Sequence, residues 1–233
     1  MVSEQHRVFV AGSTGYLGTR LIAALLQKGH SVEGLVRKGS EGKLPAGCKM
    51  IAGDPLNSDS YKHEISSHTF VHLVGVPNPN PSKAKLFREI DLPAVRASVN
   101  AATHAGIKHF VYLSVAHPAP VMKAYVQTRI EAEQMIRESG LNATMLRPWY
   151  VLGPGHRWAY ALIPFYKLFE CLPSTREGAL RCGLVSIKQM IASLVNAVET
   201  PAAGVRIVTV ADIKTIFGCG GATPSDSGAG LSF

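Results

Sequence analysis

The sequence predicts an α/β protein built on a doubly wound parallel sheet, and three observations support this prediction. Short β-branched runs alternate with longer helical patterns through the first half of the chain. The first run leads directly into a glycine-rich turn and a helix, as in a βαβ unit. The 233 residues are 46% hydrophobic and 17% charged, with a mean hydropathy of +0.12. This is enough apolar chain for one full core and a small lobe beside it.

Apolar periodicity sets the bounds of the expected elements. The expected strands are Arg7 to Ala11, Ser31 to Val36, Lys49 to Ala52, Phe70 to Val74, His109 to Leu113, Ala143 to Leu146 and Val205 to Val210. The expected helices are Gly15 to Lys28, Leu92 to Ala105, Lys123 to Ser139, and one from an N-cap at Ser186 to near Glu199. The strands are rich in β-branched and aromatic residues, and Gly29, Gly106 and Gly140 end the first three helices.

Composition narrows the classes of partner and the compartment. The excess of 24 basic over 16 acidic residues gives a net charge of +8, but the basic residues are dispersed and carry no nucleic-acid-binding signature. The four cysteines form no C-x-x-C pair, so we predict neither a disulfide scaffold nor a thiolate zinc site, and we expect no metal site of another kind. No signal-peptide pattern and no run of roughly 18 apolar residues is present. We therefore expect a cytoplasmic protein without nucleic-acid partners; its oligomeric state stays open.

A glycine-rich loop follows the first expected strand and opens the first helix. Its residues are Gly12, Ser13, Thr14, Gly15, Tyr16, Leu17 and Gly18. The first glycine permits a tight turn, the second lets backbone N–H groups approach a pyrophosphate, and the third allows close packing of helix on sheet. Because strand, spacing and helix agree, we favour a dinucleotide-binding loop over an ordinary strand-to-helix turn.

The spacing G-x-x-G-x-x-G resembles the extended and atypical short-chain dehydrogenase/reductase family, which includes NmrA-like proteins and the epimerase/dehydratase group. The resemblance implies a Rossmann fold, and it extends through ordered motifs from Val8 to Val210. By this resemblance, further cofactor contacts are expected at Gly53, Asp54, Pro55, Val74, Gly75, Val76, Pro148, Trp149, Tyr150 and Val151. Residues 1–150 would form the dinucleotide-binding core, residues 151–214 a reduced substrate lobe interleaved with it, and residues 215–233 a poorly ordered Gly/Ser-rich tail.

The tip of the second strand indicates which nicotinamide cofactor is bound. An acidic residue there would hold the ribose hydroxyls of NAD, whereas an arginine accommodates the 2′-phosphate of NADP. Arg37 and Lys38 occupy this place, and Glu33 lies inside the strand. We therefore predict NADP(H) in preference to NAD(H), with Arg37 binding the phosphate and Lys38 adding charge. The alternative is a solvated basic turn.

The candidate catalytic residues depart from the family's Y-x-x-x-K motif. Tyr125 and Arg129 are four residues apart and would share one helix face. Tyr125 is the expected general acid, Arg129 a cofactor-binding and electrostatic residue, and Ser114 an orienting group that also contacts the cofactor. The alternative is a surface Tyr/Arg pair without a catalytic role.

The apolar segment Trp158 to Phe169 leaves three alternatives open: packing of the small lobe, a hydrophobic substrate pocket, or contact with a membrane surface. The sequence thus predicts an NADP(H)-dependent oxidoreductase that moves a hydride to or from a small apolar carbonyl or quinone. The second function class is a non-catalytic NADP(H)-binding redox sensor or assembly factor, because binding and turnover use separable residues.

Overall fold

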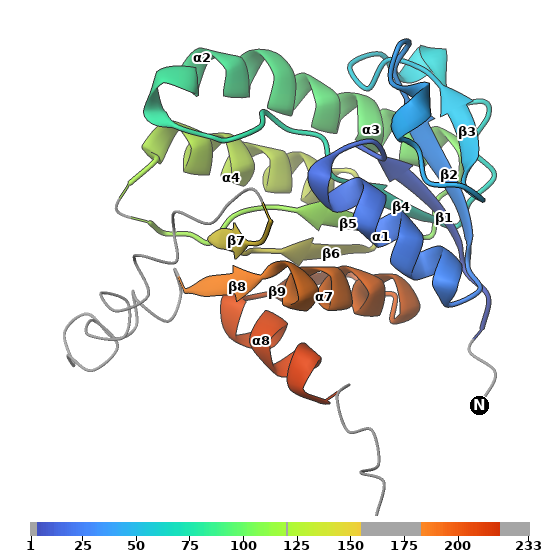
Figure 1. Cartoon of the computed structure of the whole chain (residues 1–233). Helices are drawn as coiled ribbons and strands as arrows, with labels where there is room; N and C mark the ends of the chain where they lie inside the picture. Colours follow the sequence, from blue (N-terminus) through green and yellow to red (C-terminus); the bar gives the residue numbers. More distant parts are fainter. Residues whose placement is uncertain (1–3, 120, 155–182, 220–233) are drawn as a thin grey trace, which may run out of the picture.

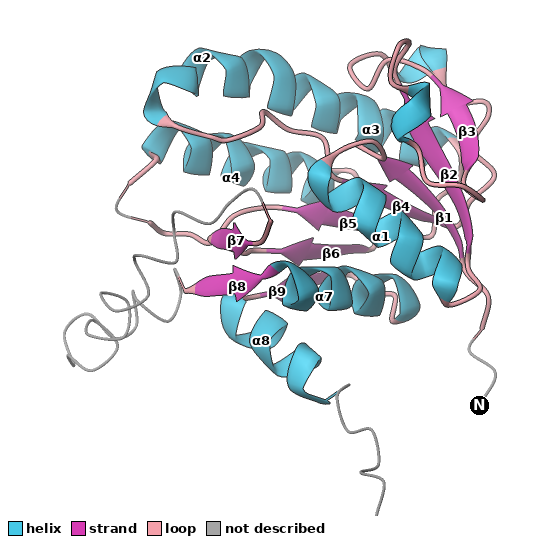
Figure 2. Ribbon diagram, viewed as in Figure 1, coloured by secondary structure: helices cyan, strands magenta, loops and turns pink. Residues whose placement is uncertain are grey.

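The protein is described by a computed structural model that covers residues 4–119, 121–154 and 183–219. Its main sheet has seven parallel strands in the order β3-β2-β1-β4-β5-β6-β9 (Figures 1 and 2). The strands are β1 (Arg7–Ala11), β2 (Ser31–Val36), β3 (Lys49–Ala52), β4 (Thr69–His72), β5 (His109–Leu113), β6 (Ala143–Leu146) and β9 (Val205–Val208). The order reverses direction between β1 and β4, which is the topological switch point of a Rossmann fold. The predicted fold class is confirmed.

Helices cover both faces of this sheet. On one face lie α1 (Tyr16–Gln27), α7 (Ile187–Glu199) and α8 (Val210–Cys219), and on the other α3 (Leu92–His104) and α4 (Lys123–Glu138), as Figure 1 shows. Alternation along β1 explains the two layers, because successive strand side chains point to opposite faces. Val8 and Val10 enter the core beneath α1 and α7, whereas Phe9 and Ala11 enter the core beneath α3 and α4.

Several short elements were not expected from the sequence. A second, two-stranded parallel sheet pairs β7 (Tyr150–Leu152) with β8 (Leu184–Ser186). Short helical turns are η1 (Glu41–Lys43), η2 (Ser58–Ser60) and η3 (Pro81–Lys83). The helix that contains α3 starts earlier than predicted, with α2 (Ala84–Leu86) and the π-helical turn η4 (Phe87–Asp91). Pro93 explains the wide turn, because it has no N–H and its ring would clash with a carbonyl four residues back.

The C-terminal bounds correct the sequence-based expectation. The last strand ends at Val208, not Val210, and α8 runs five residues into the segment predicted as a tail from residue 215. The side chains of Thr209 and Asp212 hydrogen-bond each other's backbone N–H at the start of α8, and Ile213 is fully buried. The fourth strand likewise ends at His72, so Val74 lies in a loop. Trp158 to Phe169, and the predicted tail from residue 220 on, lie outside the described residues.

A buried polar pair lies under α3. His72 is 0% exposed, and its Nδ1 lies 2.8 Å from the hydroxyl oxygen of Ser98, which is also buried. Burial, assisted by the nearby charge of Arg129, lowers the pKa of His72 to about 3. Within the described ranges, no helix combines the length and apolarity needed to cross a bilayer.

Packing of α8 gives a first prediction. Ile213→Ala should lower the free energy of unfolding by about 2–4 kcal/mol, because it leaves a cavity in the core. Thr215→Ala, at an exposed position of the same helix, is the control and should change it by less than about 0.5 kcal/mol. Urea unfolding measures both; equal stability of the Ile213 variant and the wild type would contradict the packing of α8.

The second prediction concerns pH. The unfolded chain binds a proton on His72 below about pH 6.5, but the folded protein binds it only below about pH 3. The free energy of unfolding therefore falls as the pH decreases from 6.5 towards 3. His72→Gln, which can still hydrogen-bond Ser98, should lose about 2 kcal/mol less than the wild type between about pH 7 and about pH 5. Equal losses in urea unfolding at the two pH values would refute the assignment.

Candidate functional site: a dinucleotide crevice

The glycine-rich loop lies where β1 passes into α1. Gly15 is the N-cap of α1, with extended backbone and no side-chain cap, and the first turn contains no acidic residue. The first N–H groups of a helix have no partner within the helix, and their end of the macrodipole is positive. This end of α1 therefore suits an anion such as a pyrophosphate.

Close packing explains the outer two glycines of the loop. Gly12 has φ +87°, and a Cβ there would lie 2.8 Å from the carbonyl carbon of Leu73 in the loop after β4. A Cβ on Gly18 would lie 2.1 Å from the carbonyl oxygen of Gly12. A side chain fits at neither position. The loop thus rests directly on the residues that follow β4, at the switch point of the sheet, and this cradle fits a dinucleotide.

The other loop residues hold the loop in place. Ser13 is fully buried, and its hydroxyl donates to the carbonyl of Leu35 in β2 at 2.5 Å. Tyr16 carries the Arg20 guanidinium over its ring at 4.1 Å. Thr14 and Leu17 are half-buried. Ser13 therefore ties the loop to β2, and its hydroxyl proton is engaged in that bond.

Two exposed cations stand at the end of β2. Arg37 and Lys38 are both exposed, and neither forms an ion pair within the part of the chain that the structure describes. Glu33 is buried, and its carboxylate accepts hydrogen bonds from Lys49 and from Ser66. Burial by itself would raise the pKa of Glu33, but these hydrogen bonds hold it below its usual value. Glu33 is thus engaged within the sheet.

Glu41, an acidic residue of this turn, was not predicted as a site residue from the sequence. Glu41 accepts a hydrogen bond from the backbone N–H of Gly39 at 2.9 Å. Backbone N–H groups of Glu41 itself and of Gly39 hold the pKa of this carboxyl below its usual value. The turn from residue 37 to 41 keeps an excess of positive charge. The signal was visible as an acidic side chain two residues after a turn glycine.

The end of β3 lies beside this turn. The N–H of Gly53 donates to the carbonyl of Val36 at 3.0 Å. Asp54 is exposed and accepts from the N–H of Leu56 at 3.0 Å, while Pro55 is buried. The contacts expected from Gly53, Asp54 and Pro55 with the adenine side of a cofactor stay predictions.

The loop after β4, residues 73–76, is held from below by a buried ion pair. Asp91 is 1% exposed; one carboxylate oxygen accepts from the N–H of Val76 at 2.9 Å, and the other lies 3.1 Å from Nη2 of Arg129. The other guanidinium nitrogen, Nη1, donates to the hydroxyl oxygen of Tyr112 at 3.1 Å and to the carbonyl of Leu113 at 3.2 Å. Burial raises the pKa of Asp91, and the charge of Arg129 acts against that rise. Asp91 was not predicted from the sequence, because its partner Arg129 is 38 residues away in the chain.

Tyr125 and Arg129 meet on α4, as their spacing predicts. The guanidinium carbon lies 5.0 Å from the centre of the Tyr125 ring, and the Phe87 ring centre lies 5.0 Å away from that ring as well. Tyr125 is half-buried, whereas Arg129 is 5% exposed. The Arg129 guanidinium contacts the face of the Tyr125 ring. It is directed towards Asp91 and β5.

The structure does not bring Ser114 to Tyr125. Ser114 is 3% exposed and donates its hydroxyl proton to Glu133 of α4 at 2.6 Å. Glu133 also accepts from Nε of Arg147 at 2.9 Å, and His117 Nε2 lies 3.4 Å from it. Burial would raise the pKa of Glu133, but hydrogen bonds from Arg147 and Ser114 lower it. The orienting role of Ser114 stays a prediction, now restricted to accepting a hydrogen bond.

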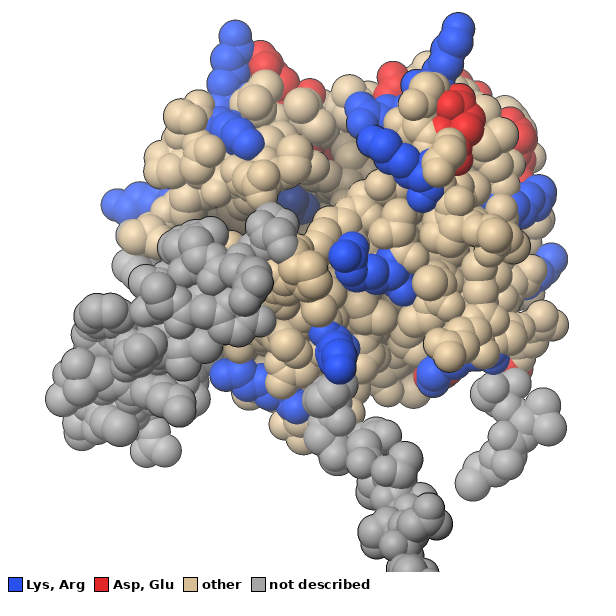
Figure 3. Space-filling model, in the orientation of Figure 1, with Lys and Arg blue, Asp and Glu red and all other residues tan. Residues whose placement is uncertain are grey.

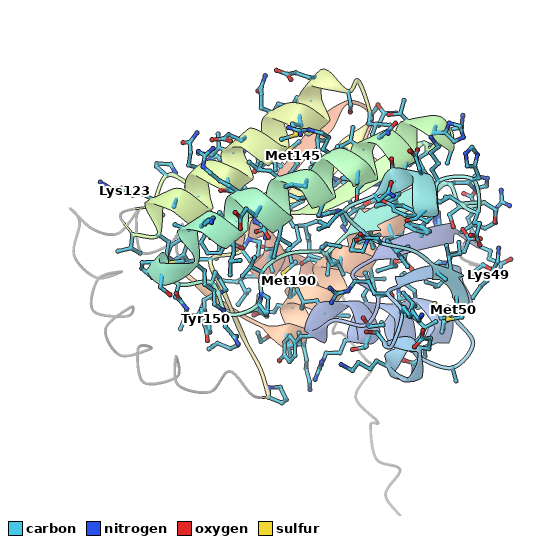
Figure 4. All side chains as sticks on the ribbon, turned by 90° about the horizontal axis from the view of Figure 1, so that it is seen from above. Lys49, Met50, Lys123, Met145, Tyr150 and Met190 are labelled. Atoms are coloured by element: carbon cyan, nitrogen blue, oxygen red, sulfur yellow. The ribbon has the colours of Figure 1, made fainter. Side chains whose placement is uncertain are left out.

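The segment after β6 returns over the phosphate loop. Pro148 is buried, its carbonyl accepts from the N–H of Ala116 at 2.9 Å, and Trp149 packs on the α1–α7 core. Tyr150 and Val151 form β7, and Tyr150 lies at the end of the molecule opposite to β3 (Figure 4). Gly153, which follows β7, lies close to α1. A Cβ on Gly153 would lie 2.1 Å from the Tyr16 hydroxyl oxygen.

These segments border one face of the protein. Figure 3 shows a hollow between the side of α2 and the side of α1, with Lys and Arg side chains around it. A separate groove of about 610 Å³ lies between α1, α7 and α8, and none of the predicted site residues lines it. Among the described residues, no group of three or more His, Cys, Asp or Glu could hold a metal ion.

Comparison with known proteins agrees with this geometry. The chain is 24% identical over 211 residues to the ceramide reductase of Caulobacter vibrioides, covering 89% of this chain and 65% of that protein. It is 25% identical over 147 residues to the photosystem II assembly factor Ycf39 of Cyanophora paradoxa, covering 60% of this chain and 44% of that protein. The chain thus spans less than two thirds of the length of either relative.

Among solved structures, the NAD⁺ complex of the Bordetella bronchiseptica enzyme WbmH has the same fold, with a TM-score of 0.66 and 18% identity over 92% of this chain and 80% of that one. The sequence profile of a family described as NAD(P)H-binding matches residues 12–161, from the first glycine of the phosphate loop to beyond β7. This match takes in more than half of the chain and the crevice described above. The chain therefore belongs to the NAD(P)H-binding family.

Proposed function

We propose that the protein is an NADP(H)-dependent oxidoreductase that transfers a hydride to or from a small apolar carbonyl or quinone. The observation that carries the cofactor preference is the pair of exposed cations, Arg37 and Lys38, at the end of β2. They stand on the strand to which Ser13 ties the phosphate loop. A guanidinium suits the 2′-phosphate of NADP, because it donates two parallel hydrogen bonds.

The chain's own residues would hold the cofactor along the switch point. The N-terminus of α1 would bind the pyrophosphate, and the loop after β4 would support the nicotinamide side. When bound, the cofactor supplies a hydride donor or acceptor. For Tyr125, the proposed role is to give a proton to the substrate oxygen or take one from it. The Arg129 guanidinium carbon lies 5.0 Å from the centre of its ring.

Support for a reductase also comes from the ceramide reductase among the relatives. The matched part is 65% of that protein, so its substrate is not assigned to this chain. The apolar segment Trp158 to Phe169 lies outside the described residues, and its proposed role in selecting an apolar substrate rests on composition.

A second candidate function is binding of NADP(H) without turnover, as in a redox sensor or an assembly factor. Two observations favour it. Arg129, which stands where the family motif has lysine, is engaged by Asp91 and Tyr112 inside the protein. One relative is the assembly factor Ycf39.

The third prediction tests the cofactor preference. Arg37→Ala should weaken NADPH binding about 10- to 100-fold through loss of a charge-assisted hydrogen-bond pair, and leave NADH binding within about twofold. Fluorescence titration of the reduced nicotinamide measures both. Glu41→Gln is the matched control in the same turn and should not weaken the binding of either cofactor. Equal affinity of the wild type for NADH and NADPH would refute the preference.

The fourth prediction separates the two functions. Tyr125→Phe should lower NADPH turnover on a panel of quinones and carbonyls by about 10²- to 10⁴-fold, because it removes the proton donor, and it should keep NADPH affinity. The two measurements are the rate of NADPH oxidation with each panel member and a titration of NADPH binding. Saturable binding by the wild type without turnover of any panel member supports the non-catalytic function. Unchanged turnover of the variant removes Tyr125 from the mechanism.

A further inference from the structure

We propose that the Asp91–Arg129 ion pair is a positioning device: it fixes the backbone of the loop after β4 in the position that the cofactor requires. This inference rests on the proposed function, because it assigns a role within the same crevice. Arg129 and Asp91 are then positioning residues, which act on the cofactor through the backbone of residues 75 and 76. Arg129 would not take the place of a catalytic lysine.

The carboxylate of Asp91 joins two parts of the protein. Oδ1 accepts from the N–H of Val76 at 2.9 Å, and Oδ2 binds Nη2 of Arg129 at 3.1 Å. The loop backbone and α4 are therefore attached to the same side chain. Because Asp91 and Arg129 are 1% and 6% exposed at their side chains, water screens this contact little.

The guanidinium extends the same connection to β5. Its Nη1 donates to the Tyr112 hydroxyl oxygen and to the Leu113 carbonyl, at the end of that strand. A lysine has a single ammonium on a flexible stem. It could not reproduce the hydrogen bonds that the two guanidinium nitrogens make with Asp91, Tyr112 and Leu113. This geometry gives a physical reason for arginine at position 129.

The loop after β4 is in close contact with its surroundings at Gly75 and at Leu73. On the lower side, a Cβ on Gly75 would lie 2.6 Å from Nη2 of Arg129. On the upper side, Gly12 of the phosphate loop lies against the backbone of Leu73. A shift of the ion pair would therefore move the loop with respect to the anion-binding end of α1. A displacement of about 1 Å at an active site can lower the rate of its reaction by as much as 100-fold.

The π-helical turn directs Asp91 into this position. η4 ends at Asp91, and Pro93 follows in the first turn of α3. A π turn carries one more residue than an α turn, so it rotates the side chains that follow. Asp91 is fully buried, whereas Arg88 in the same turn reaches outward and pairs with Glu131 of α4 at 3.1 Å. Two ion pairs thus join η4 to α4, one beneath the loop and one at the surface.

The surface pair provides a matched control for the fifth prediction. Asp91→Asn and Arg129→Lys should each weaken NADPH binding about tenfold. The double variant should bind NADPH no more weakly than the weaker-binding single variant, because both changes break the same ion pair. Glu131→Gln breaks the exposed pair and should change the affinity by less than about twofold. The measurements are fluorescence titrations of NADPH at a temperature where circular dichroism shows that every variant is folded.

A third change protects the test against loss of folding. Gly75→Ala keeps both charges and adds one methyl group against Nη2 of Arg129, and it should weaken NADPH binding in the same direction. Wild-type affinity in the folded Asp91 and Gly75 variants overturns the proposal. So does a rise in turnover without loss of affinity in Arg129→Lys, because that result would give position 129 a catalytic role. Absence of NADPH binding in the wild type and in Glu131→Gln would instead remove the proposed function, and the inference with it.

Discussion

Gly12 lies against the backbone of Leu73, and this contact places the phosphate loop and the loop after β4 at a single point of the sheet. The parallel register of β1 with β4 brings the ends of both strands to the same edge, Ala11 opposite His72. The chain turns in opposite directions after these two strands, which opens a crevice between their ends. The N-terminus of α1, the basic turn after β2 and the Asp91–Arg129 pair all lie around this contact.

The sheet and the phosphate loop are predictable from the sequence because both are local patterns. The bounds of β1, β2, β3, β5 and β6 match their apolar runs, and the capping box at Ser186 starts α7 as expected. The errors occur where tertiary contacts decide. The tail residues 215–219 are helical because Ile213 and its neighbours pack against α7, and such packing leaves no strong period in a short, Gly-flanked segment.

The candidate site shows the same division. Spacing correctly places Tyr125 beside Arg129, since residues four apart meet on any helix. It does not reveal which way the guanidinium turns, because its partner Asp91 is 38 residues away in the chain. Ser114 directs its proton to Glu133 for a similar reason: the choice between substrate and protein partner depends on the packing of α4 on β5. Pairings between distant elements determine these roles, and a single sequence does not record them.

The bond from Ser13 to the Leu35 carbonyl acts together with the bond from Gly53 to the Val36 carbonyl. These two bonds connect the phosphate loop, the end of β2 and the end of β3. The adenine half of a dinucleotide would meet a surface that is already ordered, so its binding costs little conformational entropy. A substitution that breaks either bond would therefore disturb the surface that meets the adenine half of the cofactor.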